Sequence, residues 1–322
     1  MNEVLVGIDV GGSKTEAVVA AVDGTIVGQA IVATGMAGAT GVLRAIEQAV
    51  NEAIAQSGCA GSAVLAAGVG IPGQVDAETG IVHHAVNLSL LSYPLRRELG
   101  AVFGDAPVIV ENDVRLAALG VYHDLQNHDP VRSLAYLSVG TGIAAGIVVD
   151  GQLYRGAHGM AGEIGHVVVD PGGTTCNCGL RGCLETVASG PAIAARAGLP
   201  GKDGTQPDTA AVFSAAARGE PRAVIVVEEV AKYLGQTLHW LAMTYDVERI
   251  VVGGGVSRAG AALWEPLTAQ LEKLRAQSTL AATLLPAERV MLLAMTVNPG
   301  AFGALALAQK AAGDVLSAVT NP

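Results

Sequence analysis

The segment from His158 to Glu185 reads HGMAGEIGHVVVDPGGTTCNCGLRGCLE and holds three of the four cysteines of this 322-residue chain. These three, Cys176, Cys178 and Cys183, lie close together in the sequence. So few cysteines cannot form a disulfide framework, and an odd number in one cluster argues against simple local pairing. A metal site is the better explanation of the cluster, because thiolate sulfur is a strong metal ligand.

Glycine-rich loops are a second feature that could support chemistry. Three of them follow strand-like sequence: Gly11 and Gly12 in the first, Gly140, Thr141 and Gly142 in the second, and Gly253, Gly254 and Gly255 in the third. Glycine lets the backbone approach phosphate oxygens closely, and the N–H groups of such loops bind anions. The first loop alone could be an ordinary β-turn with a solvated lysine, but the three together predict a site for a nucleoside triphosphate.

The first loop also carries polar side chains that suit a phosphate ligand. Ser13 and Thr15 could donate hydrogen bonds to it, and Lys14 would supply one positive charge. Asp9, at the end of the preceding strand, could hold Mg²⁺ through water.

Two of the loops have similar surroundings. The stretches VGIDVGGSKTEAVVA and AYLSVGTGIAAGIVV each place a glycine-rich turn between two apolar strands. A Rossmann fingerprint would open a helix after its strand, whereas both of these loops continue into alternating, β-branched sequence. We therefore expect two hairpins, and their repetition predicts two similar lobes.

Composition excludes several classes of function. The formal net charge is −10 and the 19 Lys and Arg are scattered, so the protein should repel nucleic-acid backbones. No apolar run reaches the roughly 18 residues that a membrane span needs, and the N-terminus does not read as a signal peptide. The hydrophobic share, 51%, is ample for substantial cores. We expect a cytoplasmic protein without nucleic-acid or membrane partners.

Strand-like and helix-like patterns alternate along the chain, which is typical of the α/β class. The helices are clearest at 41–58, 221–245, 260–278 and 300–313, and the buried strands lie between them. A polar stretch at 122–133 is the expected boundary between the two lobes.

The motifs DVGGSK, GIPG, END, VGTGI, GEIGH, CNCGLRGCLE and VVGGG occur in this order over nearly the whole chain. In this combination the sequence resembles the ROK family (repressor, open reading frame, kinase), and within it the glucokinase-like sugar kinases. The resemblance implies an α/β protein with the two-lobed actin-like ATPase (ribonuclease H-like) fold and a sugar in the cleft between the lobes. It implies a small lobe at 1–118, with the helix 300–322 packing back on it, and a large lobe at 119–299.

The resemblance also assigns roles to polar residues. Asp113 matches the catalytic base of the family, which accepts or orients the proton of the sugar hydroxyl, although Asp at a helix start is also a common N-cap. Asn87 and Asn112 match positions that bind sugar hydroxyls, and an amide can both donate and accept hydrogen bonds. Glu163 and Glu185 match residues that contact the sugar.

The cysteine cluster gains a fourth ligand on this template. His166 precedes the cysteines with the spacing His-x₉-Cys-x-Cys-x₄-Cys, and four such ligands would close a tetrahedral zinc shell. The zinc would be structural, because a closed shell has no open position. Its effect would be to fix the ring of His166, so that one nitrogen binds the metal and the other faces the sugar. Buried, metal-free cysteines are the alternative.

We therefore expect an ATP-dependent kinase that phosphorylates a hexose, with glucose and its 6-hydroxyl as the first choice. ATP, Mg²⁺ and a structural Zn²⁺ are the expected cofactors, and a homo-oligomer, dimer or tetramer, is the expected assembly. One alternative changes the acceptor to an N-acetylated or amino hexose, or the donor to polyphosphate. Another is a sugar-responsive regulator, although no DNA-binding helix-turn-helix precedes the first loop in this sequence.

Two departures from the family pattern bear on the substrate. After the Asn-Asp pair, many family kinases continue with Ala-Asn, whereas this chain has Val114 and Arg115. The second glycine loop continues with Ala144 and Ala145 where glycines are usual. We expect these changes to affect the rim of the sugar site more than catalysis.

Overall fold

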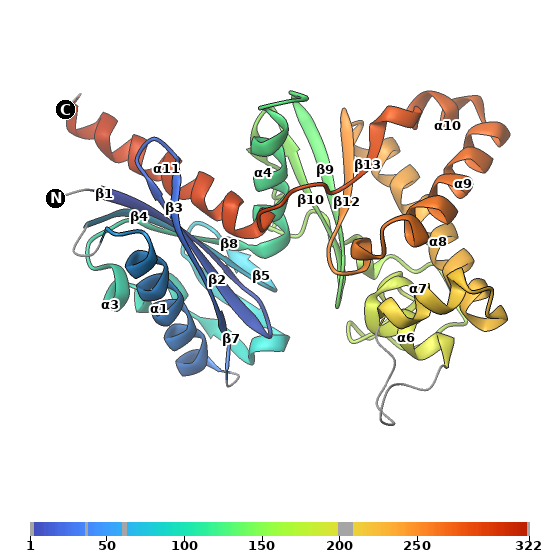
Figure 1. The fold of residues 1–322 in the computed structure, drawn as a ribbon, viewed down its shortest axis with the longest axis horizontal. Coiled ribbons are helices and arrows are strands. Elements are labelled where there is room, and N and C mark those ends of the chain that lie inside the picture. Colours follow the sequence, from blue (N-terminus) through green and yellow to red (C-terminus); the bar gives the residue numbers. More distant parts are fainter. Residues whose placement is uncertain (1–2, 36–37, 60–62, 199–208, 321–322) are drawn as a thin grey trace. The chain divides into compact units, whose positions relative to one another are not determined.

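The computed structural model describes residues 3–35, 38–59, 63–198 and 209–320 (Figure 1). The chain divides into two compact units. Unit 1 comprises Met1–Pro130, Arg155–Met160 and Met295–Pro322, and unit 2 comprises Val131–Tyr154 and Ala161–Ala294. Each unit combines a five-stranded sheet with helices, as an α/β chain requires.

The sheet of unit 1 has the strand order β3-β2-β1-β4-β8. Its strands are β1 (Glu3–Val10), β2 (Lys14–Ala21), β3 (Ile26–Ala33), β4 (Ala63–Ile71) and β8 (Val108–Asn112). The first three form an antiparallel meander, and β4 and β8 run parallel to β1. The turn between β1 and β2 is therefore the hairpin expected from the first glycine-rich loop.

Helices cover both faces of this sheet (Figure 1). Along β1, Val4, Val6 and Ile8 point to one face and pack with α1 (Ala39–Gln56), while Leu5 packs on the other face with α11 (Pro299–Thr320). Gly7 allows α11 to approach closely, because a Cβ at this position would lie 2.4 Å from a carbonyl oxygen of that helix. The alternation of β1 thus buries both faces of the strand.

Unit 1 also contains a small antiparallel sheet that the sequence analysis did not predict. It is formed by β5 (Gln74–Asp76), β6 (Ile81–Ala85) and β7 (Leu90–Tyr93), in that order. A 3₁₀ turn, η1 (Val86–Leu88), follows β6, and two short helices, α2 (Leu95–Glu98) and α3 (Gly100–Phe103), follow β7.

The sheet of unit 2 repeats the plan of unit 1, with the order β11-β10-β9-β12-β13. Its strands are β9 (Ser133–Val139), β10 (Ile143–Val149), β11 (Gln152–Leu153), β12 (Arg249–Gly253) and β13 (Val290–Leu292). An antiparallel hairpin comes first, and β12 and β13 continue parallel to β9. The internal similarity predicted from the two hairpins is confirmed by this matching strand order.

The other regular elements that the structure describes in unit 2 are helices and 3₁₀ turns. Its helices are α5 (Glu185–Ala188), α6 (Gly190–Ala197), α7 (Thr209–Ala217), α8 (Pro221–Tyr245), α9 (Ala261–Gln277) and α10 (Thr279–Leu284), with the 3₁₀ turns η2 (Ile164–His166), η4 (Val256–Ala259) and η5 (Ala287–Arg289). Leu234, Leu238 and Leu241 of α8 are fully buried and belong to the core of unit 2. No helix of the described residues is long and apolar enough to cross a membrane.

The unit boundaries differ from those predicted. The boundary placed after residue 118 falls inside α4 (Asp113–Leu125), and unit 1 continues to Pro130, within the polar stretch 122–133. The reason is packing: a Cβ at Gly120 of α4 would lie 2.1 Å from the carbonyl oxygen of Pro299 in α11, so the whole of α4 belongs with α11. The segment Arg155–Met160 also joins unit 1.

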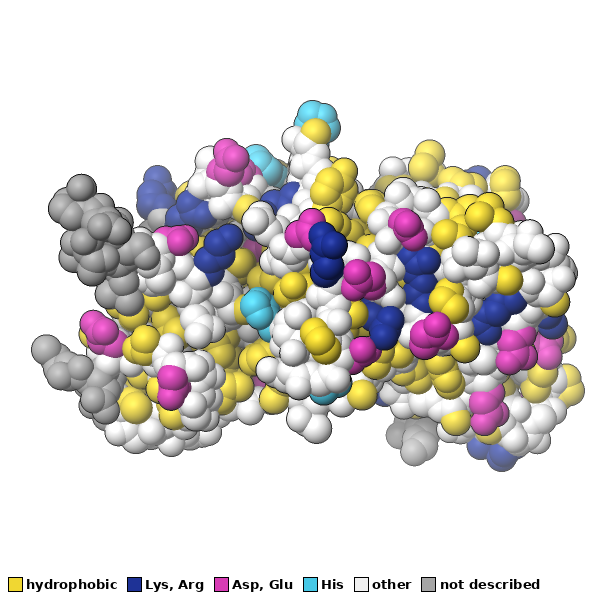
Figure 2. Space-filling view, turned by 90° about the horizontal axis from the view of Figure 1, so that it is seen from above, with side chains coloured by type: hydrophobic (Ala, Val, Ile, Leu, Met, Phe, Trp, Pro, Cys, Tyr) yellow, Lys and Arg dark blue, Asp and Glu magenta, His cyan; other side chains and the backbone are white. Residues whose placement is uncertain are grey.

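Figure 2 presents one face of the molecule as a space-filling surface. On this face Lys and Arg side chains alternate with Asp and Glu, with apolar side chains between them. This mixture agrees with the scattered basic residues of the sequence.

Candidate active site and metal centre

The first glycine-rich loop is the hairpin between β1 and β2. Gly12 and Ser13 are exposed, and the backbone N–H of Gly11 closes the turn on the carbonyl of Lys14 at 2.8 Å. Thr34, the residue directly after β3, supports the loop, since its hydroxyl donates to the carbonyl of Gly11 at 2.7 Å. The loop therefore offers its outer N–H groups from a fixed backbone.

Thr15 requires a correction. Its side chain is fully buried, and its hydroxyl shares a hydrogen bond of 3.1 Å with that of Thr34. The hydroxyl thus stabilises the base of the hairpin and does not face a ligand of the loop. After the exposed Lys14, β2 is buried almost throughout, and Thr15 is the first residue of this buried stretch.

Asp9 lies opposite Glu16 in the β1–β2 pair, and Asn298 joins the two carboxylates. The Asn298 amide nitrogen donates to Oδ2 of Asp9 at 2.8 Å and to Oε2 of Glu16 at 2.9 Å. Burial raises the pKa of Asp9, the hydrogen bond from Asn298 opposes the rise, and the charge of Glu16 adds to it. Lys14 lies 3.8 Å from Glu16, with half of its side chain exposed.

Sequence reasoning missed Asn298. Its Oδ1 accepts a hydrogen bond of 2.9 Å from the N–H of Gly300, so that it caps the start of α11. The signal was present, because Asn before Pro and a small-residue helix is typical of an N-cap followed by proline at the first helical position.

Asn87 lies beside the first loop. It is an exposed residue of η1, and a Cβ at Gly12 would contact its Cβ at 3.6 Å. Ser89, directly after η1, adopts the left-handed conformation, with φ of 53°. The structure therefore brings a predicted sugar ligand next to the predicted phosphate loop within unit 1.

Asn112 and Asp113 occupy the junction of β8 and α4. The helix is capped by Asn112, whose Oδ1 accepts from the N–H of Arg115 at 3.1 Å and whose Nδ2 donates to the carbonyl of Gly73 at 3.1 Å. Asp113, for which an N-cap was the alternative role, is instead the first residue of the helix. Its Oδ1 accepts from the N–H of Val114 at 2.9 Å, so the carboxylate is held half-buried at the strand end.

In unit 2, the second and third glycine-rich loops lie side by side. Their strands pair, with Ser138 of β9 opposite Gly253 of β12, and a Cβ at Gly140 would lie 3.6 Å from the backbone nitrogen of Gly255. Gly190 joins them, because its N–H donates to the carbonyl of Gly140 at 2.8 Å. Two of the three glycine-rich loops that were predicted to bind phosphate are therefore neighbours within unit 2.

Gly190 also begins α6, and Ser189 is the N-cap of that helix. The helix N-terminus therefore lies against the second loop and adds partial positive charge there. This helix start was not among the predicted site features, although Ser-Gly-Pro is a recognisable capping signal.

Glu163 and His166 are positioned by close packing on β10. The backbone of Gly162 meets Ala145, whose N–H donates to the carbonyl of Gly162 at 2.8 Å. Gly165 is equally close, because a Cβ there would lie 2.0 Å from the carbonyl oxygen of Ile143. Glu163 precedes η2 and His166 ends it, and both are half-buried.

Glu185 begins α5 and contacts the second loop. Its Oε2 accepts a hydrogen bond of 3.0 Å from the N–H of Ile143. A Cβ at Gly142 would lie only 2.6 Å from the same oxygen. The carboxylate therefore anchors the end of this loop, a contact that sequence spacing did not predict.

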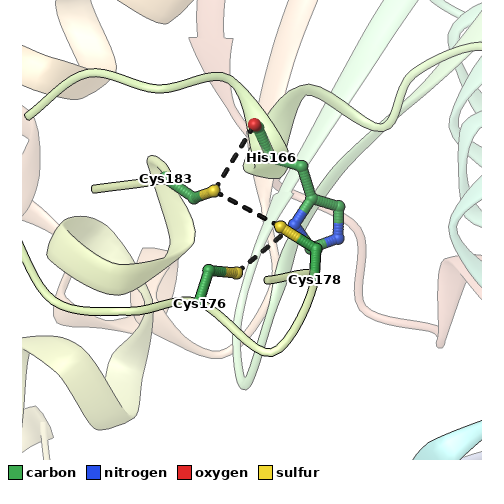
Figure 3. A group of neighbouring side chains, drawn as sticks. All are labelled: His166, Cys176, Cys178 and Cys183. Atoms are coloured by element: carbon green, nitrogen blue, oxygen red, sulfur yellow. Dashed lines mark hydrogen bonds between the residues drawn. The ribbon is translucent and has the colours of Figure 1, made fainter. Parts of the chain in front are cut away.

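The predicted metal ligands form one cluster in unit 2 (Figure 3). One donor atom from each of His166, Cys176, Cys178 and Cys183 lies within 4.8 Å of all the others. The Nδ1 of His166 is 3.5 Å from Sγ of Cys176, and the sulfurs of Cys178 and Cys183 are 3.6 Å apart. Tetrahedral zinc with Zn–S bonds of about 2.3 Å needs sulfurs about 3.8 Å apart, so the donor set fits this ion.

The second ring nitrogen of His166, Nε2, points away from the sulfur atoms (Figure 3). The chain is drawn together around the cluster by Gly182, whose N–H donates to the carbonyl of Thr174 at 2.9 Å. Val168 pairs with Cys183 as an isolated bridge.

The environments of two of the cysteines differ strongly. Burial raises the pKa of the Cys183 thiol to about 12, and hydrogen bonds among the cysteines add to the rise. A backbone hydrogen bond from Leu180 lowers the pKa of Cys178. A metal that binds both sulfurs must displace a proton from Cys183, so its binding would release acid.

Comparison with known proteins identifies the family. The ROK family profile matches residues 5–311. The chain belongs to the ROK family. The glucokinase of Halalkalibacterium halodurans is 36% identical to this ROK protein, and the match covers 83% of this chain and 84% of the relative. The N-acetylmannosamine kinase of Citrobacter koseri is 37% identical, over 57% of this chain and 64% of the relative.

A solved structure of similar shape is the ROK glucokinase of Streptomyces griseus in complex with glucose and AMPPNP. It is 31% identical, with a TM-score of 0.79, and the match covers 95% of this chain and 99% of that one. The predicted family and the predicted two-lobed, actin-like ATPase fold are confirmed. The prediction that this ROK protein is a sugar kinase, a phosphotransferase, is confirmed as well.

Proposed function

We propose that this ROK protein transfers the terminal phosphoryl group of ATP to the 6-hydroxyl of glucose. The observation that carries the proposal is the fixed carboxylate of Asp113 at the end of β8, in the same unit as the phosphate hairpin and Asn87. A carboxylate at a strand end, oriented by a helix N–H, is suited to accept a hydroxyl proton. The glucokinase relatives support glucose as the acceptor.

In the proposed reaction, Asp113 accepts the proton of the glucose 6-hydroxyl while the oxygen attacks the terminal phosphorus of ATP. The bond from this phosphorus to the bridging oxygen breaks, and ADP leaves with that oxygen. Asn87 and Asn112 bind other hydroxyls, because each amide has both donor and acceptor atoms. Glu163, Glu185 and Nε2 of His166, all in unit 2, are the further sugar ligands of this proposal. Most of the catalytic effect would come from positioning and from electrostatic stabilisation, as is general for phosphoryl transfer.

The nucleotide would be held chiefly by backbone N–H groups. Gly12 and Ser13 offer theirs in unit 1, and the two adjoining loops of unit 2, with the start of α6, offer theirs in the other unit. Asp9 has the hard oxygen donors that Mg²⁺ prefers, and Asn298 fixes one of them. Mg²⁺, when bound, would neutralise charge that develops on the phosphates.

We propose a structural zinc at His166, Cys176, Cys178 and Cys183. With four protein ligands the shell has no open position, so this metal would not take part in the reaction. It would hold the imidazole of His166 in one orientation and thereby one side of the sugar site. A homo-oligomer, dimer or tetramer, stays a prediction.

An N-acetylated hexose is the second candidate acceptor. The N-acetylmannosamine kinase relative favours it, although that match covers a smaller share of both chains than the glucokinase match does. The two acceptors differ at the C2 substituent, so the same catalytic groups would serve either.

A coupled kinase assay across a panel of hexoses and amino sugars tests the proposal, with ATP and polyphosphate compared as donors. We expect kcat/KM for glucose with ATP to exceed that for any N-acetylated hexose, and for polyphosphate, by at least about tenfold, a difference of about 1.4 kcal/mol. A preference for an amino sugar would replace glucose by the second candidate. Tight sugar binding without any transfer would point to a regulator.

A further inference from the structure

A buried cluster of charged side chains lies next to the junction of β8 and α4. Glu111 is completely buried, and Arg115 is 4% exposed. Oε1 of Glu111 accepts from Nη1 of Arg115 at 3.0 Å and from the N–H of Asn112 at 2.8 Å. Oε2 accepts from Nε of Arg155 at 2.6 Å. The carboxylate is therefore surrounded by donors from three different segments.

Arg115 makes a second contact, because its Nη2 donates to the backbone carbonyl of Gly159. Gly159 and Arg155 both belong to the segment Arg155–Met160, which packs with unit 1 although the chain on either side of it belongs to unit 2. Three residues after this segment ends, the chain reaches Glu163. Two guanidinium groups thus tie a crossing segment to the strand end that carries Asn112 and Asp113.

Stability alone is a weak explanation for such a cluster. A buried ion pair loses hydration, and apolar residues of similar volume often stabilise a core as well or better. What the cluster supplies is geometry. The planar guanidinium of Arg115 reaches two acceptors at once in fixed directions, whereas a lysine ammonium is a point charge on a flexible stem.

We propose that Arg115 is a positioning residue of the sugar site, which clamps the segment Arg155–Met160 to the end of β8 before the sugar binds. The proposal rests on the function proposed above. A segment that is already ordered does not have to lose conformational freedom when sugar binds, so the clamp favours sugar affinity. Asp113 accepts its own hydrogen bond from the N–H of Val114, so we expect the clamp to act on sugar affinity more than on the chemical step.

Arg115→Met removes both contacts and keeps an unbranched, apolar side chain that can fill the space of the arginine stem. Arg115→Lys keeps a charge for Glu111 but lacks the second nitrogen that reaches Gly159. The matched control is Arg132→Met, which removes an exposed arginine paired with Asp150 in unit 2, where the two side chains are 80% and 64% exposed. Steady-state kinetics with glucose and ATP would be measured for all three. Hydrogen–deuterium exchange would be followed for a peptide that covers 155–160.

For Arg115→Met we expect the KM for glucose to rise at least about tenfold, with kcat within about threefold of wild type and the KM for ATP unchanged. Exchange in 155–160 should become at least about fivefold faster, because the segment opens more often. Arg115→Lys should give smaller changes in the same directions, and it decides the matter if the Met variant does not fold. The control should match wild type.

Wild-type glucose KM together with wild-type exchange in 155–160, in either folded variant, would overturn the proposal. A loss of kcat with unchanged glucose KM would also overturn it, because the residue would then act on the chemical step. If the wild-type protein phosphorylates no sugar, the proposed function fails separately. The exchange of 155–160 still shows whether Arg115 clamps this segment.

Discussion

Asn298 lies 289 positions from Asp9 along the chain, and its amide nitrogen donates a hydrogen bond of 2.8 Å to Oδ2 of Asp9. The same residue caps α11 through its Oδ1. A helix start from the end of the chain therefore fixes a carboxylate at the end of the first strand. Because burial raises the pKa of Asp9, its charged form is disfavoured in the fold relative to the unfolded chain.

The burial of Asp9 predicts a conflict between stability and function. A carboxyl whose pKa is raised by folding contributes its full stability below its unfolded pKa of about 4 and loses it as the pH rises through the folded value. Asp9→Asn does not titrate, so it avoids this loss of stability. Its side-chain oxygen can still accept the hydrogen bond from Asn298. Without added Mg²⁺ at pH 7.5, we expect the variant to melt at least about 2 °C higher than wild type, with a smaller difference at pH 4.5. A variant that is less stable at pH 7.5 would contradict this.

The same variant tests the metal. If Asp9 positions Mg²⁺ for transfer, turnover of Asp9→Asn should fall at least about 10²-fold while glucose affinity stays within a factor of two. Wild type should require a divalent cation, so EDTA should stop transfer and added Mg²⁺ should restore it. Zinc content is measured in parallel to separate the two metals. Full activity with EDTA would exclude the proposed role.

Asp113→Asn should lower turnover at least about 10²-fold, because an amide keeps the shape and the hydrogen bond to Val114 but cannot accept the hydroxyl proton. Glucose binding, measured by calorimetry, should survive. Asp124→Asn on the same helix is the control and should leave turnover unchanged. Near-normal turnover in a folded Asp113→Asn protein would mean that another group accepts the proton.

Much of the fold follows from local sequence, and the long-range contacts do not. The alternation in β1 and β2 and the glycines between them predict a hairpin, and the structure has one. The burial of Thr15 and the contact of Asn298 with Asp9 depend on β3 and α11, which local patterns do not bring together. The same holds for the boundary after residue 118, since α4 stays in unit 1 because of α11.

For the candidate site too, local sequence predicted some features and missed the contacts between distant segments. The spacing of His166 and the three cysteines predicted a cluster that the structure forms. The capping role considered as an alternative for Asp113 belongs to Asn112, because α4 already begins at Asp113. The contact of Glu185 with Ile143 needs the fold of α5 onto the second loop, so no local pattern reveals it.

Gly162 offers a test of how Glu163 is positioned. Its φ is 92°, and a Cβ there would lie 1.8 Å from the carbonyl oxygen of Ala145. Gly219 has a φ of 79°, and no atom lies within 4 Å of a Cβ built there. Gly219→Ala therefore has the backbone strain of a positive φ but no steric clash, and it is the control. Gly162→Ala should therefore destabilise the protein by at least about 2 kcal/mol more than the control and raise the KM for glucose. Equal melting temperatures in the two variants would show that the packing on β10 relaxes freely.

A variant of the cysteine cluster tests whether the metal has a structural or a catalytic role. Metal analysis of the wild-type protein should find about one zinc per chain, as a closed four-ligand shell requires. Cys178→Ala should release it, because a shell with three ligands binds the ion far more weakly. Cys59→Ala removes a half-buried cysteine of unit 1 outside the cluster and is the matched control.

Loss of the zinc should weaken glucose binding much more than ATP binding, because His166 would no longer be held in one orientation. We expect glucose affinity to fall at least about tenfold, in line with the usual effect of disturbed metal surroundings, and the melting temperature to fall with it. Calorimetric titrations with glucose and with a non-hydrolysable ATP analogue measure the two affinities. If Cys178→Ala kept its zinc, or lost nucleotide binding while it bound glucose normally, the link from the metal through His166 to the sugar would be wrong.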